Sequence, residues 1–438
     1  MLAKDSDKKT EWRIKMIQII CKSESYTYNA YHILKAFYPS QEVSCKTDEE
    51  ASNYVTVQLP DGQEIFAETE KKRQTDLNLY DQLEKITGEP LAWGVLTGVR
   101  PTKLAMQKLE AGWKKEDYIR WAWESARVRK EKAVLAWEIA ERERKILEEL
   151  DYEEGYSLYV GIPFCPSVCS YCSFSSGPLD RWKEKVDVYV DTLCKELEFI
   201  AERSKNKKLN TIYIGGGTPT TLTAEQLERL MGWIDEKFSR EHLLEYTVEA
   251  GRPDSITEEK LKVIKSHGIT RISINPQSMQ RKTLDAIGRK HTVEEIKEAY
   301  ALARETGFDN INMDIIAGLP GEDISDMEDT LAQIAQMKPD SLTVHSLAIK
   351  RAARLNTQKE DYAGRKSLNS ESTMELTQDM AEKMGMKPYY LYRQKNMTGN
   401  MENVGYAKPG KEGIYNILIM EEMQTIVALG AGAITKAV

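Results

Sequence analysis

The chain has 438 residues, of which 41% are hydrophobic and 30% are charged, and its formal net charge is -8. This length predicts two or three domains, and the acidic balance argues against general nucleic-acid binding, which depends on a basic surface. No apolar run approaches the roughly 20 residues that cross a bilayer, and the first residues lack the apolar core of a signal peptide. Six cysteines in so long a chain are not a disulfide framework. We therefore expect a cytoplasmic protein without a membrane span.

Residues 1–80 are predicted to form a small α/β module. Residues 12–21 are rich in β-formers, and a helix is expected at 28–37. The alternating runs 54–59 and 63–67 flank a Pro-Asp-Gly sequence typical of a hairpin turn.

Residues 81–150 are predicted to be a charged helical region, most clearly at 128–150. The apolar stripe of this last helix contains Trp137, Ile139, Ile146 and Leu147. Its many charges are interpreted as a solvated face.

Residues 151–350 alternate short β-rich runs with helical patterns. The six runs expected to be strands are 158–160, 211–214, 245–248, 270–274, 311–316 and 341–345. Thr223 with Gln226, and Thr292 with Glu295, have the spacing of helix capping boxes. Six β/α units in succession predict an α/β fold in which parallel strands form a partial (β/α)6 TIM-type barrel, with its chemistry at the carboxyl ends of the strands.

Residues 351–438 are predicted to be a mostly helical cap, and the family resemblance described below implies that it covers the substrate. A strand is expected at 387–393. The pattern at 414–434 stops at Val438 without a terminating signal, so we expect the natural fold to continue further.

Three cysteines follow the first predicted barrel strand. Cys165, Cys169 and Cys172 have the spacing C-x-x-x-C-x-x-C. Three thiolates suit a cubane iron–sulfur cluster with one iron left open to a small molecule. The alternative is structural zinc, which normally takes four ligands, often as two separated cysteine pairs, and the sequence has no second pair. Soft thiolates bind both metals, so it is the spacing that favours the cluster.

Polar and glycine residues follow the next strands. The sequence Gly-Gly-Gly-Thr-Pro at 215–219 follows the second strand, where glycines permit close backbone approach to a ligand. Glu249 ends the third strand, Gln277 follows the fourth, Arg289 opens the next helical region, and Asp314 lies in the fifth strand. Singly, such residues are usually solvated surface groups. Together, they predict a polar site at the barrel mouth.

Four motifs resemble the radical S-adenosylmethionine superfamily. They are YVGIPFCxxxCxYC from Tyr159, GGGTP from Gly215, IGRxHT from Ile287 and DxxxGLPG from Asp314. Within the superfamily the chain is similar to the oxygen-independent coproporphyrinogen III oxidase (coproporphyrinogen dehydrogenase) group. Residues 96–103 point to the HemZ type of that group.

This resemblance implies a cofactor set and a reaction. Cys165, Cys169 and Cys172 would hold a 4Fe–4S cluster. The residues implied to contact S-adenosylmethionine or to shield the cluster are Tyr159, Tyr171, Gly216, Gly217, Thr218, Glu249, Gln277, Arg289 and Asp314. The implied reaction removes a hydrogen atom from a propionate of coproporphyrinogen III and releases carbon dioxide, and two rounds yield protoporphyrinogen IX. A reduced flavodoxin or ferredoxin is the implied electron donor.

Two departures from the family pattern concern the cluster region. Gly161 stands where the family often has histidine, and Phe174 where the best-studied members carry a further cysteine that is not a cluster ligand. The alternatives are a haem-binding chaperone of the same group and a related radical enzyme that transfers methyl groups or opens the haem ring.

Several further residues have interpretations of their own. His345 is a candidate to face the site. Ordinary surface charge is the favoured interpretation of four further cations, and pairing with substrate propionates is the alternative: Arg100, Lys103, Arg393 and Lys395. The remaining cysteines, Cys21, Cys45 and Cys194, are expected to be small buried hydrophobes.

Overall fold

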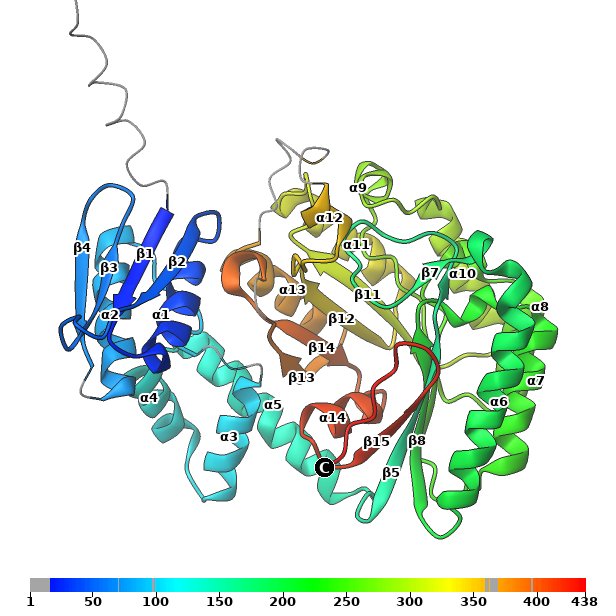
Figure 1. Cartoon of the computed structure of the whole chain (residues 1–438). Helices are drawn as coiled ribbons and strands as arrows, with labels where there is room; N and C mark the ends of the chain where they lie inside the picture. The colour runs from blue at the N-terminus through cyan, green and yellow to red at the C-terminus, as the bar shows by residue number, and fades with distance from the viewer. Residues whose placement is uncertain are drawn as a thin grey trace, which may run out of the picture.

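The computed structural model describes residues 16–69, 71–96, 98, 100–358, 362, 369–394 and 397–438. A curved sheet with helices on its outer face forms the larger part, and a smaller N-terminal module stands beside it, joined by helices (Figure 1). Residues 12–15 of the first predicted strand and Lys395 lie outside the described residues. None of the described helices is long and apolar enough to cross a bilayer.

The N-terminal module is a four-stranded sheet with the order β2-β1-β3-β4. Its elements are β1 (Met16–Cys21), α1 (Glu24–Phe37), β2 (Glu42–Thr47), β3 (Tyr54–Gln58), β4 (Glu64–Glu68) and α2 (Lys72–Thr87). The predicted hairpin is confirmed, because β3 and β4 pair antiparallel and bury alternate residues such as Val55 and Val57. Cys21 and Cys194 are buried as expected, but the prediction for Cys45 is wrong. Cys45 is exposed because β2 is an edge strand of this sheet.

Three helices connect the module to the large sheet: α3 (Pro101–Glu110), α4 (Lys115–Ala126) and α5 (Lys130–Glu148). In α5 the predicted apolar stripe is confirmed, since Trp137, Ile139 and Leu147 are buried. The interpretation of its charges as a solvated face is wrong for Lys132 and Glu143, which are also buried. Both charges are covered because α5 packs between the helices α3 and α4 and the C-terminal strand β13 (Lys387–Tyr392).

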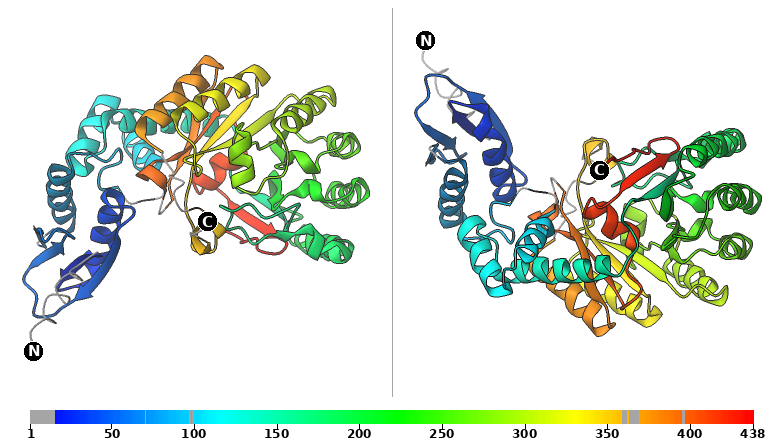
Figure 2. Two further views of the ribbon diagram at one scale, coloured as in Figure 1. Left: turned by 90° about the horizontal axis from the view of Figure 1, so that it is seen from above. Right: turned by 90° about the horizontal axis from the view of Figure 1, so that it is seen from below.

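The six predicted barrel strands are confirmed, and neighbouring strands pair in parallel in chain order. They are β5 (Gly155–Ile162), β8 (Lys208–Gly216), β9 (Glu245–Glu249), β10 (Arg271–Ser273), β11 (Ile311–Ala317) and β12 (Ser341–Ser346). The helices of this part are α6 (Val186–Arg203), α7 (Ala224–Lys237), α8 (Glu258–Ser266), α9 (Arg281–Ala286), α10 (Val293–Glu305) and α11 (Ile324–Met337). Figure 2 shows helices around the outer, convex face of the sheet. Both predicted capping boxes form, at the starts of α7 and α10.

The C-terminal region contributes strands as well as helices. It contains α12 (Arg354–Thr357), α13 (Glu371–Lys383), β13, β14 (Asn403–Ala407), α14 (Ile414–Met420) and β15 (Thr425–Leu429). The antiparallel pair β13 and β14 extends the β12 edge, while β15 lies parallel to β5 at the other edge. The nine-stranded sheet runs from β13 to β15 and stays open, so the barrel is partial. Helix α14 lies inside the curve of the sheet (Figure 2).

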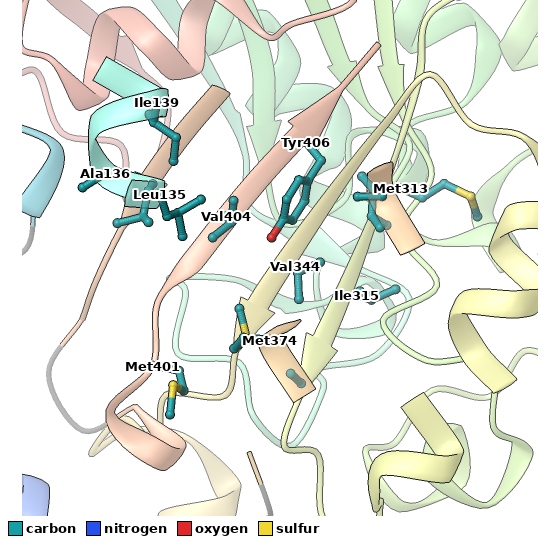
Figure 3. Packing of buried hydrophobic residues seen from close by; sticks show 14 of the residues in the cluster. Leu135, Ala136, Ile139, Met313, Ile315, Val344, Met374, Met401, Val404 and Tyr406 are labelled. Carbon is teal, nitrogen blue, oxygen red and sulfur yellow. The ribbon is translucent and has the colours of Figure 1, made fainter. Parts of the chain in front are cut away.

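A continuous apolar core joins α5 to the large sheet. Figure 3 shows Leu135 and Ile139 of α5 near Val404 of β14, with Val344 and Ile315 of the next two strands beyond them. All five side chains are at most 4% exposed. Burial of one such side chain contributes about 1.5–3 kcal/mol, so this packing fixes α5 firmly against the C-terminal strands.

Candidate functional site

A cavity of about 690 Å³ lies at the carboxyl ends of the barrel strands. All the candidate site residues line it: Tyr159, Cys165, Cys169, Tyr171, Cys172, Gly216, Gly217, Thr218, Glu249, Gln277, Arg289 and Asp314. They come together because parallel strands in chain order present all their carboxyl ends to one side of the sheet.

The three thiols stand in one loop that is closed at its base. Cys165 ends the short strand β6 (Phe164–Cys165), which pairs with β7 (Gly177–Pro178). The N–H of Cys172 donates to the carbonyl of Cys169 at 3.2 Å, which makes a turn between these two thiols. Thr218 Oγ1 donates to Cys165 Sγ at 3.5 Å. The loop therefore presents its thiols from a backbone that is hydrogen-bonded on both sides.

The donor set, three cysteine thiols, has the composition of a cluster site. In the described part of the chain, no three His, Cys, Asp or Glu side chains are gathered closely enough to hold one metal ion. The ligands of a cubane cluster each bind a different iron atom, so they are spread around a larger group. Three free thiols along one cavity wall match that arrangement.

Two guanidinium groups stand beside Cys169. Arg252 Nη1 lies 3.7 Å from Cys169 Sγ, and Arg289 Nη2 lies 3.5 Å from the hydroxyl of Tyr171. Burial alone raises the pKa of the Cys169 thiol, but the charges of Arg289 and Arg252 outweigh it and lower that pKa below its ordinary value. For Cys172, burial dominates and the thiol pKa is raised. Cys169 is therefore the better prepared of these two to be a thiolate, the form that binds iron.

The glycine turn after β8 supports the cysteine loop. The N–H groups of Gly217 and Thr218 donate to the carbonyls of Ile162 and Phe164, both at 2.7 Å. A Cβ at Gly217 would lie 2.6 Å from the carbonyl oxygen of Phe164. The close backbone approach expected from this motif is present, and it is made to the start of the cysteine loop. The contacts of this turn with S-adenosylmethionine stay a prediction.

Two carboxyl groups in the cavity have opposite pKa shifts. Glu249 accepts hydrogen bonds from the hydroxyl of Tyr213 and, at 2.9 Å, from Asn275 Nδ2. Burial and the nearby charge of Asp314 raise the pKa of Glu249 to about 7. For Asp314, burial also favours the neutral form, but the contact with His345 outweighs it and lowers the pKa. Neighbouring carboxyls with separated pKa values can carry different protonation states at neutral pH.

Gln277 offers an acceptor without a protein donor. Its backbone has a positive φ of +67°. Its N–H donates a hydrogen bond to the carbonyl of Asp314 in β11 at 2.9 Å. Its side-chain Oε1 is buried and has no hydrogen-bond partner among the described residues. A buried polar atom of this kind normally has a partner. S-adenosylmethionine carries ammonium and hydroxyl donors, so this acceptor fits its binding in the cavity.

Three of the four cations considered for propionate binding, Arg100, Lys103 and Arg393, do not line the cavity. Arg100 and Lys103 pair with Glu422, at 2.7 and 3.3 Å. Arg393 is buried and donates to the carbonyl of Leu96 at 2.6 Å. The interpretation as ordinary surface charge is therefore favoured for Arg100 and Lys103, whereas Arg393 is buried and fits neither interpretation.

Besides Arg271 of β10, sequence reasoning missed two cavity cations that come after strand ends, Arg252 and Lys350. Lys350 shortly follows β12, and no hydrogen bond or ion pair joins its ammonium group to a described residue. Burial lowers the pKa of Lys350. Both residues follow strand ends, which is the positional signal that could have found them. His345 also lines the cavity, as expected, with Nδ1 3.3 Å from the hydroxyl of Tyr392.

The fold and the thiol-lined cavity define a radical S-adenosylmethionine protein, and residues 159–334 match the family described as the Radical SAM superfamily. The chain is 44% identical over 383 residues to the oxygen-independent coproporphyrinogen-III oxidase-like protein HemZ of Bacillus subtilis, covering 86% of this chain and 76% of that protein. It is 32% identical over 280 residues to the heme chaperone HemW of the same organism, covering 63% and 70%. The chain belongs to the radical S-adenosylmethionine superfamily, in the group that contains HemZ and HemW.

A solved structure supports the fold. Coproporphyrinogen III oxidase (HemN) from Escherichia coli superposes with a TM-score of 0.53 at 24% identity, covering 67% of each chain. The family's cofactors are a 4Fe–4S cluster and S-adenosylmethionine, and these are the cofactors of this chain.

Proposed function

We propose that this chain catalyses the oxygen-independent oxidative decarboxylation of coproporphyrinogen III to protoporphyrinogen IX in porphyrin and haem biosynthesis. The observation that carries the proposal is one cavity that combines three thiols, polar groups at the strand ends and a lysine ammonium without a protein partner. The 44% identity to an oxygen-independent coproporphyrinogen-III oxidase-like protein supports a porphyrinogen substrate.

In this proposal Cys165, Cys169 and Cys172 hold the cluster. The residues proposed to surround S-adenosylmethionine are Tyr159, Tyr171, Gly216, Gly217, Thr218, Glu249, Gln277, Arg289 and Asp314. Bound there, the two cofactors supply the one-electron chemistry that takes a hydrogen atom from an unactivated carbon. Glu249 and Gln277 would orient S-adenosylmethionine by accepting hydrogen bonds from its N–H and O–H groups. Tyr213 and Asn275 hold the carboxyl group of Glu249 in place by donating hydrogen bonds to it.

Lys350 is the proposed partner of a substrate carboxylate. Three arginines also line the cavity, but each guanidinium donates to the protein: Arg252 to Asp254, Arg271 to Ser341 Oγ, and Arg289 to the carbonyl of Asn275. An ammonium group without such a partner gains a charge-assisted hydrogen bond when a carboxylate enters.

The residues that line the cavity suggest a role for each part of the chain. We propose that residues 151–350 form the catalytic core and residues 351–438 cover the substrate, since Tyr392, Asn403 and Asn416 line the cavity. Residues 1–80 and 81–150 are proposed as separate units that support the core. A reduced flavodoxin or ferredoxin is the proposed donor, and the cytoplasm, where thiols stay reduced, is the proposed location.

The decisive experiment is an anaerobic assay on reconstituted protein. Reductant, S-adenosylmethionine and coproporphyrinogen III are added, and the product is identified by mass. A porphyrin that has lost carboxyl groups as carbon dioxide is expected. A methylated or ring-opened product contradicts the proposal.

A haem chaperone is the second candidate, because the chain also covers 70% of the HemW protein at 32% identity. This candidate predicts a stable haem complex. Haem added to purified protein would then give a persistent Soret band, and the decarboxylated product would be absent from the assay.

A further inference from the structure

Arg252 is a buried arginine at the edge of the cysteine loop, and its side chain is 3% exposed. It stands between the end of β9 and the short helix η4 (Pro253–Ser255). Its Nε and Nη2 donate to the two carboxylate oxygens of Asp254, at 2.9 and 2.6 Å. The guanidinium plane is therefore held in one orientation by a bidentate contact.

The remaining nitrogen of Arg252 faces the cysteine loop. Nη1 donates to the carbonyl and the hydroxyl of Ser167, at 3.1 and 3.2 Å, and lies 3.7 Å from Cys169 Sγ. The same loop is tied on its other side to the turn between α9 and α10, where Ser170 N–H donates to the carbonyl of Ile287 at 2.9 Å. Arg252 thus links β9 to the segment that presents Cys169. A lysine has no planar fork and cannot make all these contacts at once.

We propose that Arg252 is a positioning residue which fixes Cys169 and, together with Asp254, sets the reduction potential of the cluster. The inference rests on the proposed function in one respect, namely that Cys169 holds the cluster. Reduction adds one electron to the cluster, so a buried cation and an N–H donor at its sulfur stabilise the reduced form. The carboxylate of Asp254 partly cancels that cation.

The two members of the pair therefore act in opposite directions. In Arg252→Gln the cation and its donor to the sulfur are lost, and the midpoint potential is expected to become more negative. In Asp254→Asn the cation loses its counter-charge, and the potential is expected to become more positive. Arg252→Lys keeps the charge without the fork and is expected to lie between Arg252→Gln and the unmodified protein.

The experiment is a redox titration of the reconstituted full-length protein at one pH, followed by the electron paramagnetic resonance signal of the reduced cluster. Iron and sulfide content and the circular dichroism spectrum are recorded for every variant. The matched controls are Arg229→Gln and Asp187→Asn, which break an arginine–aspartate pair of 2.8 Å on the outer helices. These controls are expected to leave the potential unchanged.

Shifts of opposite sign for Arg252→Gln and Asp254→Asn support the proposal. Potentials that shift in the same direction, or that match the controls, overturn it. If Arg252→Gln folds but retains no cluster, the midpoint potential of Asp254→Asn decides: a more positive potential supports the proposal, and an unchanged or more negative one overturns it. If the unmodified protein itself takes up no iron–sulfur cluster, it is the proposed function that fails, and the two failures are thereby distinguished.

Discussion

The two walls of the cavity are built in different ways. The cluster-side wall is one short loop, with its three thiols between Cys165 and Cys172, held by backbone hydrogen bonds to the neighbouring glycine turn. The second wall brings together residues from three segments: His345 and Lys350 at and after the end of β12, Tyr392 of β13 and Asn416 of α14. The first wall is therefore a local structure, whereas the second exists only when distant segments are assembled.

The second wall also depends on the helices that precede the barrel. Glu402, just before β14, is 1% exposed and accepts from Lys132 Nζ of α5 at 2.6 Å and from Trp93 Nε1 at 2.7 Å. The next residue, Asn403, lines the cavity and accepts from the N–H of Ser346 at 2.9 Å. The helical region after residue 81 therefore has a physical role, which is to hold the second wall of the cavity in place.

The largest expected effect is at the cluster-side wall. Replacing Cys165, Cys169 or Cys172 by alanine removes a thiolate that no other described group near the cavity can replace. We expect complete loss of the cluster, measured as iron and sulfide content, and of product formation. Cys45→Ala is the control, because this thiol is exposed on the N-terminal module. A variant that keeps a full cluster after loss of Cys169 contradicts the assignment.

The next largest effect is expected at the second wall and not at the cluster-side wall. Lys132→Met leaves the buried carboxylate of Glu402 without its cation, which costs about 3–5 kcal/mol of unfolding free energy. Denaturant unfolding measures the loss. We expect substrate binding to weaken while the cluster still assembles, because the cluster-side wall makes no contact with this pair.

The matched control for that variant is Lys115→Met. Its ion pair with Glu138 of α5 is 2.7 Å long but partly exposed, so its loss is expected to cost less than about 1 kcal/mol. Equal destabilisation by both variants would falsify the role assigned to Lys132.

A smaller effect is expected for substrate recognition. In the proposed function, Lys350→Ala removes a hydrogen bond to a substrate carboxylate, worth about 1.5–3 kcal/mol, so KM for coproporphyrinogen III should rise roughly tenfold to a hundredfold. Lys103→Ala is the control, because Lys103 pairs with Glu422 away from the cavity. The opposite result, a raised KM in Lys103→Ala and an unchanged KM in Lys350→Ala, would favour Lys103 as the residue that binds a propionate.

The smallest effect is a pH dependence of stability. The pKa of Glu249 in the folded protein is about 7, above its ordinary value of 4.5. A raised carboxyl pKa contributes stability that is complete below the unfolded pKa and is lost as the pH rises through the folded pKa. The thermal midpoint of the cofactor-free protein should therefore fall by a few degrees between about pH 5 and pH 8.

Glu249→Gln should flatten this dependence, since the amide does not titrate. The exposed Glu328→Gln should retain it. An unchanged slope in Glu249→Gln means that another group titrates in this range.

Much of the fold followed from local patterns. The six barrel strands were predicted because buried parallel strands appear as short apolar runs between amphipathic helices. The capping boxes at Thr223 and Thr292 were predicted because they depend on residues three positions apart. The thiol loop and the residues at the strand ends were predicted because their position after a strand determines which side of the sheet they reach.

The sequence by itself therefore determined the succession of β/α units, the thiol loop and the membership of one cavity. Tertiary structure alone decided the burial of Lys132, the exposure of Cys45, the freedom of Lys350 and the contact of Arg252 with Cys169. The physical reason is that a charge is satisfied by whatever lies near it in space. Lys132 and Glu402 are 270 positions apart, and no pattern within either segment records that they meet.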